Sequence, residues 1–324
     1  MKKTALARIV CIVLLLASIH LLYLFNLNAG HNELPSLTWL EEWIAQAVVT
    51  EANNSSPAND NSPAVFAFMT EPRCLAAVPF VLKNALDKLP PSFPVVFFHS
   101  SHNAKCLERW LNETPALWQA HETGRLIVEL ESHMDPNAKK IYEGSNWNNV
   151  LFTNITFWEG LRQYGNTALT IQADTLICAD GNSSNPYNYT PPWDANYLGG
   201  ISWVKDVLPS NASNTNHLNG GLSIRNLDWV ISCLQQSKNF SDPEDNLFGN
   251  CKGGVNNVSV VDAMSFSSDN GYTMCFDWDG HRQCPWGVHK PWERPSRRRP
   301  AQYRELVSYC PDIEKLQVLL RTNG

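Results

Sequence analysis

Short apolar segments alternate with segments of helical periodicity along most of the chain, and this alternation constrains the fold more than any other feature. Candidate strands lie at residues 65–69, 94–98, 126–130, 168–172 and 217–224, and candidate helices at 74–86, 106–111, 148–164, 227–236 and 301–321. Strands that alternate with helices form a mainly parallel sheet covered by helices. The sequence therefore predicts an α/β sandwich that binds its ligand beyond the carboxyl ends of the strands.

The N-terminal region has the pattern of a membrane anchor. An apolar run from Ile9 to Phe25 follows a short basic segment, and its length of about 17 residues is close to the minimum that spans a bilayer. Positive charge on the N-terminal side keeps the tail in the cytosol. We expect a cytosolic tail at residues 1–8, a signal anchor at 9–27, a luminal stem at 28–64 and one domain at 65–324. A cleaved signal peptide is the alternative.

Glycosylation sequons and cysteines support a luminal body. Asn-x-Ser/Thr sequons occur at Asn53, Asn54, Asn112, Asn154, Asn182, Asn188, Asn211, Asn239 and Asn257. Cys11 lies in the apolar run, and the other eight of the nine cysteines allow up to four disulfides whose connectivity the sequence leaves open. The net charge of −6 excludes a general affinity for nucleic acid.

Two polar groups follow candidate strands directly. Asp174, with Gln172 two positions earlier, comes after the strand at 168–172 and could help to hold a hard divalent cation. Capping of the next turn is the alternative. Arg73 follows the first strand and could contact a diphosphate, or could form a surface ion pair.

The second half of the chain contains two further candidates. Asn219 could bind sugar hydroxyls, and Gly220 and Gly221 would let a ligand approach the backbone closely, although a hairpin turn has the same pattern. Glu244 and Asp245 could supply a general base; stabilisation of a helix N-terminus is the alternative.

A late histidine lies between two tryptophans. His289 is a candidate metal ligand, and Trp286 and Trp292 could present apolar faces to the sugar rings of an acceptor. A satisfied loop histidine and two core tryptophans are the alternatives. Taken in chain order, these candidates supply every part of a metal-assisted transferase that uses a nucleotide sugar.

Residues 65–293 resemble a family of glycosyltransferases with a GT-A-like, Rossmann-like fold. The resemblance rests mainly on Gln172-Ala173-Asp174 and on the segment from Asn219 to Arg225, together with residues 71–73, 94–100, 157–158, 243–245 and 287–292. It implies a single nucleotide-sugar-binding domain in which Asp174 and His289 hold a divalent metal, with Mn²⁺ expected. Gln172 stands where the family's motif has an acid, so an amide replaces one of the expected carboxylates. The resemblance also implies that the acid pair supplies the base, and Asp245 is favoured over Glu244.

The sequence hypothesis is therefore a type II membrane glycosyltransferase of the Golgi or ER. It would move a sugar from a UDP- or GDP-sugar to a hydroxyl of a glycan or glycoprotein. Inversion or retention of configuration stays open. One rival is a catalytically silent glycan- or nucleotide-sugar-binding protein on the same fold. The other is a glycoside hydrolase that uses Glu244 and Asp245.

Overall fold

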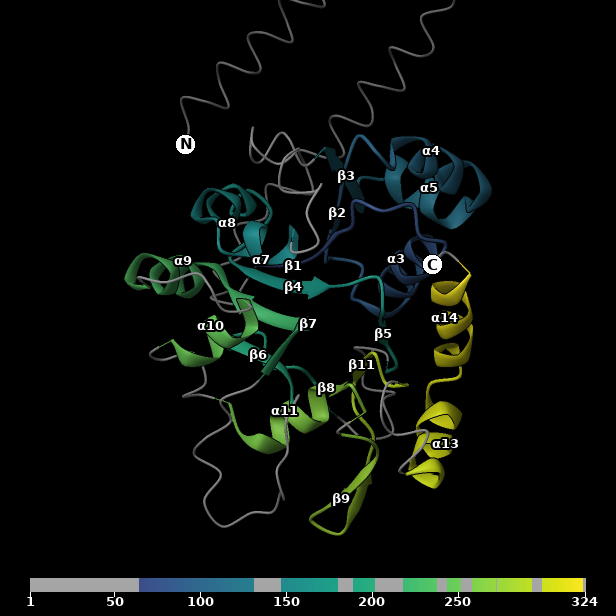
Figure 1. Ribbon diagram of the computed structural model, residues 1–324, viewed down its shortest axis with the longest axis vertical. Helices are drawn as coiled ribbons and strands as arrows, with labels where there is room; N and C mark the ends of the chain where they lie inside the picture. Colours follow the sequence, from purple (N-terminus) through teal and green to yellow (C-terminus); the bar gives the residue numbers. More distant parts are fainter. Residues whose placement is uncertain are drawn as a thin grey trace, which may run out of the picture. The chain divides into compact units, whose positions relative to one another are not determined.

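The computed structural model describes the chain from residue 64 onward, with gaps (Figure 1). The described residues are 64–130, 147–179, 189–201, 218–237, 244–251, 258–271, 273–292 and 299–322, and all of them belong to one compact unit that spans residues 62–324. The expected tail and anchor, and the expected stem up to residue 63, lie outside this part. Within it, no helix has both the length and the apolar character needed to cross a bilayer.

A six-stranded sheet forms the centre of the unit. Its order is β3 (Leu126–Leu130), β2 (Val95–His99), β1 (Val65–Thr70), β4 (Thr167–Ile171), β7 (Leu218–Asn226) and β6 (Tyr197–Ile201). The first four strands are parallel, and β7 runs antiparallel to both β4 and β6. The order reverses between β1 and β4, the topological switch point where doubly wound sheets bind ligands. The α/β fold with a mainly parallel sheet is thereby confirmed.

The strands form where the sequence is continuously apolar. Every residue of β1 and β4 is buried, as expected for parallel strands covered on both faces. The phenyl rings of Phe68, Phe98 and Phe157 meet edge to face in the core between the sheet and one helical layer. This rigid core fixes the carboxyl ends of β1 and β4, and so fixes the turns that carry the site.

Helices flank the sheet on both sides (Figure 1). One group contains α7 (Trp147–Phe152), α8 (Ile155–Leu161), α9 (Leu227–Gln236) and α10 (Glu244–Asn250). The other contains α3 (Ala77–Lys88), α13 (Pro300–Tyr309) and α14 (Asp312–Arg321). Helices α4 (Ala104–Glu113) and α5 (Pro115–Glu122) pack together beside β3, and α11 (Val260–Phe266) packs on β6.

Two expected helices are each broken in two. The expected helix at 148–164 ends with α7, and α8 starts anew where the side chain of Asn154 accepts a hydrogen bond from the backbone N–H of Thr156. The expected helix at 301–321 divides at Cys310 and Pro311, because proline has no N–H to continue the helical ladder. Periodicity alone does not reveal breaks that leave the apolar spacing intact.

A small second sheet lies next to the central one and was not predicted. It consists of β5 (Thr175–Ile177), β11 (Gly287–His289) and β8 (Ser267–Asp269), in that order. A separate hairpin is formed by β9 (Phe276–Trp278) and β10 (His281–Gln283). The three-residue strands of the second sheet bring together residues that are far apart in the sequence, and the site depends on them.

Four disulfides join all eight cysteines that follow Cys11. The pairs are Cys74–Cys106, Cys178–Cys310, Cys233–Cys251 and Cys275–Cys284. The expectation of four disulfides is confirmed, and the structure supplies the connectivity that the sequence left open.

Candidate functional site

A pocket of about 250 Å³ gathers most of the predicted site residues near the carboxyl end of β4. Of the eleven residues that line it, seven were singled out in the sequence: Gln172, Asn219, Gly220, Gly221, Glu244, Asp245 and His289. The other four are Trp147, Asn148, Asn149 and Lys290. Residues from five segments of the chain therefore meet in one place, as the strand-end argument predicted.

His289 lies between two carboxylates. Its Nδ1 is 2.6 Å from Oδ1 of Asp269, and its Nε2 is 3.3 Å from Oδ1 of Asp174. The second sheet creates this arrangement, because β8 and β11 place Asp269 and His289 opposite each other in register while Asp174 immediately precedes β5. Since a carboxylate can only accept, Nδ1 donates to Asp269, and Nε2 is directed to Asp174.

The charges of this group are strongly coupled. Burial opposes the charged form of His289, but the two carboxylates outweigh it and raise the pKa of His289 to about 9. Burial also opposes the charge on Asp174, yet His289 and then Lys290 hold the pKa of this carboxyl well below its usual range. The ammonium of Lys290 is 3.5 Å from Oδ2 of Asp174. Without a metal, the group is an imidazolium beside a carboxylate.

The same group fits a divalent cation. Nε2 of His289 and Oδ1 of Asp174 are buried atoms without a hydrogen-bond partner among the described residues. An imidazole nitrogen and a carboxylate oxygen at this separation could bind one ion between them, and Asp269 orients the ring as carboxylates do in histidine–metal sites. Mixed nitrogen and oxygen donors suit Mn²⁺ among other first-row ions. Gln172 adds no carboxylate, so the described residues offer two strong ligands here, Asp174 and His289.

The glycine pair makes room for neighbouring side chains. A Cβ on Gly221 would lie 2.5 Å from Nε2 of His289, and a Cβ on Gly220 would overlap Nη2 of Arg225. Both glycines lie inside the nine-residue strand β7, so the hairpin alternative is wrong. Oδ1 of Asn219 accepts a hydrogen bond from the N–H of Gly221 at 2.7 Å, which leaves the amide nitrogen of Asn219 to donate to a ligand.

The acid pair separates into two environments. Glu244 is 7% exposed, and its Oε1 is 3.4 Å from Nη2 of Arg225. Burial raises the pKa of Glu244, although Arg225 opposes this shift. Asp245 is more exposed and lines the same pocket. A substrate can reach Asp245 more easily, so the geometry favours Asp245 over Glu244 as a base.

Arg73 lies outside the pocket lining and is held by a neighbour. Its Nε and Nη2 donate to the two carboxylate oxygens of Glu71 at 2.7 and 2.9 Å. The side chain is 64% exposed, and it lies close enough to Asp174 to interact with that charge. One edge of the guanidinium is therefore occupied, and the Nη1 edge is the one that could meet a phosphate.

The tryptophan prediction is wrong for one of the two residues. Trp286 is 0% exposed and stacks on Phe266 with ring centroids 5.5 Å apart, so it belongs to the core and cannot contact an acceptor. Trp292 is partly buried against the core and does not line the pocket. Its acceptor role stays a prediction.

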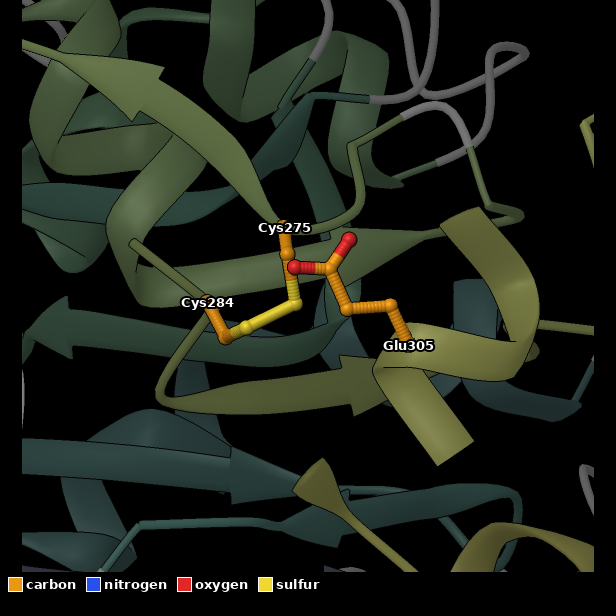
Figure 2. A group of neighbouring side chains, drawn as sticks. All are labelled: Cys275, Cys284 and Glu305. Atoms are coloured by element: carbon orange, nitrogen blue, oxygen red, sulfur yellow. A yellow bond between two sulfur atoms is a disulfide. The ribbon is translucent and has the colours of Figure 1, made fainter. Parts of the chain in front are cut away.

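A second group of metal-binding residue types is not a metal site. Cys275, Cys284 and Glu305 lie together at the base of the β9–β10 hairpin (Figure 2). The two sulfurs are bonded to each other and offer no thiolate, and Glu305 forms an ion pair with Arg282. The cluster fastens the hairpin to α13.

Some residues in or beside the pocket were not singled out in the sequence. Asn148 and Asn149 belong to the short helix α7, and Oδ1 of Asn149 accepts a hydrogen bond from the N–H of Glu244 at 3.3 Å. Asp269 lies in a polar three-residue strand that looks like a loop in the sequence. Lys290 could have been found, because it directly follows the candidate ligand His289 and lies in the same turn.

Comparisons with known proteins concern the same part of the chain. A family described as a protein of unknown function (DUF5672) matches residues 132–289, a little under half of the chain, which include ten of the eleven residues that line the pocket. No curated protein matches the sequence.

Several solved structures of similar fold are glycosyltransferases. They include the bifunctional glycosyltransferase WbbM in its apo form, with a TM-score of 0.40 over 82% of this chain and 53% of that chain. Mouse xyloside xylosyltransferase 1, also apo, has a TM-score of 0.39 over 69% and 97%. Mannosyltransferase PcManGT from Pyrobaculum calidifontis, in complex with GDP-Man and Mn²⁺, has a TM-score of 0.31 over 65% and 57%.

The chain thus spans about half the length of the first of these structures. Each of the three is 10% identical to it. At this identity and at TM-scores of 0.40 or less, none of the likenesses assigns an activity to this chain.

Proposed function

We propose that this protein is a glycosyltransferase that moves a sugar from a nucleotide-sugar donor to a hydroxyl of a glycan or glycoprotein. One observation carries the proposal: His289, which lies 3.3 Å from Asp174 in a group fitted to a divalent cation, lines the same pocket as a more exposed carboxylate, Asp245. Transfer from a nucleotide sugar needs both, because a diphosphate leaves while an acceptor hydroxyl loses its proton.

Asp174 and His289 would hold the cation, for which Mn²⁺ is the proposed ion. When bound, the ion would neutralise the negative charge of the leaving diphosphate. Arg73 would contact the diphosphate through its free edge. Lys290, beside Asp174, adds a second positive charge to the same region.

The pocket walls suit a hydroxylated ring. Four amide side chains line the pocket, those of Asn148, Asn149, Gln172 and Asn219, and amides can both donate to and accept from hydroxyl groups. The volume of about 250 Å³ lies below that of pockets for drug-sized ligands, so it suits the sugar and not the whole donor. Gly220 and Gly221 line the pocket beside the sugar, and their missing Cβ atoms make room for Arg225 and His289.

Asp245 would act on the acceptor. In an inverting reaction its carboxylate takes the proton of the attacking hydroxyl; in a retaining reaction it positions the sugar. Glu244 is buried and paired with Arg225, which leaves Asp245 as the proposed base.

A secretory location belongs to the same proposal. Four disulfides favour an oxidising compartment, and the apolar segment at 9–27 and the sequons favour a type II protein of the Golgi or ER membrane. The membrane would then be a partner of the chain through residues 9–27.

A thermal-shift screen tests the proposal. The full chain, made in a secretory host so that its disulfides form, is titrated with UDP- and GDP-sugars with and without Mn²⁺, and turnover of each stabilising donor is measured. We expect one donor class to raise the melting temperature with Mn²⁺ present. Asp174→Asn should abolish the shift, whereas Asp279→Asn, at an exposed hairpin turn, should keep it. If no nucleotide sugar stabilises the wild-type protein, the proposal fails.

One rival function has a specific observation in its favour. Gln172 occupies the position of an expected acid, so the cation has few protein ligands. A catalytically silent protein that only binds a nucleotide sugar would need no further ligands for the cation. Donor binding without turnover in the wild-type protein would favour this rival. A glycoside hydrolase is disfavoured, because it needs two working carboxyls about 5–10 Å apart across the bond, and Glu244 is tied to Arg225.

A further inference from the structure

A fully buried arginine lies behind the pocket. The side chain of Arg225, in β7, is 0% exposed, and its guanidinium carbon lies 5.0–5.6 Å from the centroids of four aromatic rings. These rings form what we call the aromatic box: Phe152, Trp158, Tyr197 and Phe248. A buried charge carries a large desolvation penalty, and well-packed apolar residues often replace it without loss of stability. The presence of a charge here therefore calls for a role beyond packing.

The guanidinium holds two groups of the pocket wall. Its Nη2 donates to the carbonyl oxygen of Gly220 at 3.1 Å and lies 3.4 Å from Oε1 of Glu244. Its Nε donates to Oγ of Ser223 at 2.9 Å, and this hydroxyl donates in turn to the same Gly220 carbonyl at 3.0 Å. A Cβ on Gly220 would lie 2.4 Å from Nη2 of Arg225, so a larger residue at this position would displace the guanidinium.

The same side chain connects three elements of the pocket. Phe152 belongs to α7, which carries the pocket residues Asn148 and Asn149, and Phe248 belongs to α10, which begins with Glu244. Gly220 belongs to β7, at the point where the pairing of β6 and β7 is irregular. Arg225 is therefore a shared partner of all three walls.

We propose that Arg225 is a positioning residue that fixes the donor pocket. By holding Glu244 and the Gly220 carbonyl, it sets the start of α10 so that the next residue, Asp245, lies in the pocket. The expected effect on turnover rests on the proposed function. The expected effect on the structure of the pocket does not depend on which ligand the pocket binds. Glu244 is then a partner of Arg225 and takes no part in the chemistry.

Four variants of the full chain test this role. Glu244→Gln keeps an oxygen that can accept from Arg225. Arg225→Met leaves Glu244 buried without its partner and would lose stability, so the double variant Arg225→Met with Glu244→Gln removes both charges and is expected to fold. Arg282→Met removes an arginine that forms ion pairs with Asp277 and Glu305 away from the pocket, and serves as the matched control.

The expected pattern separates positioning from packing and from chemistry. Arg282→Met should retain turnover. Glu244→Gln is the reference for the double variant, which should keep a melting temperature near that of Glu244→Gln and turn over about 100-fold more slowly than Glu244→Gln. Turnover of the double variant equal to that of Glu244→Gln would show that Arg225 only fills space. Failure of the double variant to fold would make Arg225 a folding residue, and turnover of Arg282→Met as low as that of the double variant would show that the loss is not specific to Arg225. Each of these three results overturns the proposal.

Hydrogen exchange keeps this test independent of the enzyme assay. If the wild-type protein turns over no nucleotide sugar, the proposed function fails, but the double variant should still speed amide exchange in α10 (Glu244–Asn250) relative to Arg282→Met. Unchanged exchange in α10 would overturn the role of Arg225 by itself.

Discussion

Replacing Gly221 with alanine should damage the position of His289. The added Cβ would lie 2.5, 2.6 and 2.7 Å from Nε2, Cε1 and Cδ2 of the imidazole. Ordinary contacts with a Cβ begin near 3.4 Å, so the ring has to withdraw by about 0.9 Å, the difference between 3.4 and 2.5 Å. The ring has little freedom to do so, because Asp269 holds Nδ1 at 2.6 Å.

Two terms set the size of the effect. Overpacking of a tight site costs about 1–3 kcal/mol, and a hydrogen bond to a charged group contributes about 1.5–3 kcal/mol, part of which is lost when the ring moves. We expect the free energy of unfolding to fall by about 2–4 kcal/mol, which lowers the melting temperature of a domain of this size by roughly 5–15 °C. Since Asp269 would no longer orient the ring well, Mn²⁺ affinity should fall about 10–100-fold.

Calorimetry on the full chain measures both quantities. A matched control is Gly280→Ala, in the turn of the β9–β10 hairpin, where φ is +73° and the new Cβ would have no neighbour within 4 Å. It should lower stability through backbone strain of about 1–3 kcal/mol and leave Mn²⁺ binding unchanged. Wild-type stability together with wild-type Mn²⁺ affinity in Gly221→Ala would refute the packing of His289 against β7.

Further predictions address the metal, the base and the disulfides. Mn²⁺ affinity should rise from pH 7 to pH 9, because a metal binds only neutral His289, whose pKa is raised to about 9. Binding should release a proton, which titration calorimetry in two buffers measures. An affinity that does not change with pH would exclude His289 as a ligand. The same proton should make the metal-free protein lose stability as pH rises from 6.5 to about 9, which denaturant unfolding at several pH values checks. Asp245→Asn should lower turnover by about 10²–10⁴-fold with donor affinity unchanged in a binding assay, and a loss of affinity alone would speak against a base. Replacing Cys178 and Cys310 with serine should lower the free energy of unfolding by ~5 kcal/mol, about twice the loss expected for the hairpin disulfide Cys275–Cys284. The reason is loop length, because Cys178–Cys310 closes a loop of 132 residues and Cys275–Cys284 a loop of 9. Equal losses in denaturant unfolding would contradict this argument.

The central sheet could be predicted from the sequence, and the small sheet could not. β1, β2 and β4 are buried apolar runs, and such runs stand out whatever lies next to them. β8 consists of Ser267, Ser268 and Asp269, all buried and all polar, so its sequence looks like a loop. Asp269 holds Nδ1 of His289, and it was missed because its strand carries no apolar pattern.

The site followed the same division. A strand end and a glycine pair located Asp174 and Gly221, because the sequence pattern is tied directly to backbone geometry there. His289 was found from its side-chain chemistry, as a candidate metal ligand. Arg225 was overlooked as a contributor, because arginine is rarely buried and its position in a strand suggested nothing about an aromatic box. Trp286 was misassigned, because proximity in sequence to His289 does not distinguish a ring in the core from a ring at the surface.

The disulfide that closes the longest loop, Cys178–Cys310, constrains the order in which disulfides can form during synthesis. Cys74 and Cys106 both leave the ribosome before Cys178, but Cys178 must wait for Cys310, which follows 132 positions later. At about 5–20 residues per second this wait lasts roughly 7–26 s, and four other cysteines emerge during it. In an oxidising compartment Cys178 meets four wrong partners before the right one. Correct pairing of the nascent chain therefore requires that Cys233–Cys251 and Cys275–Cys284 close among themselves, or that disulfide exchange repairs early errors.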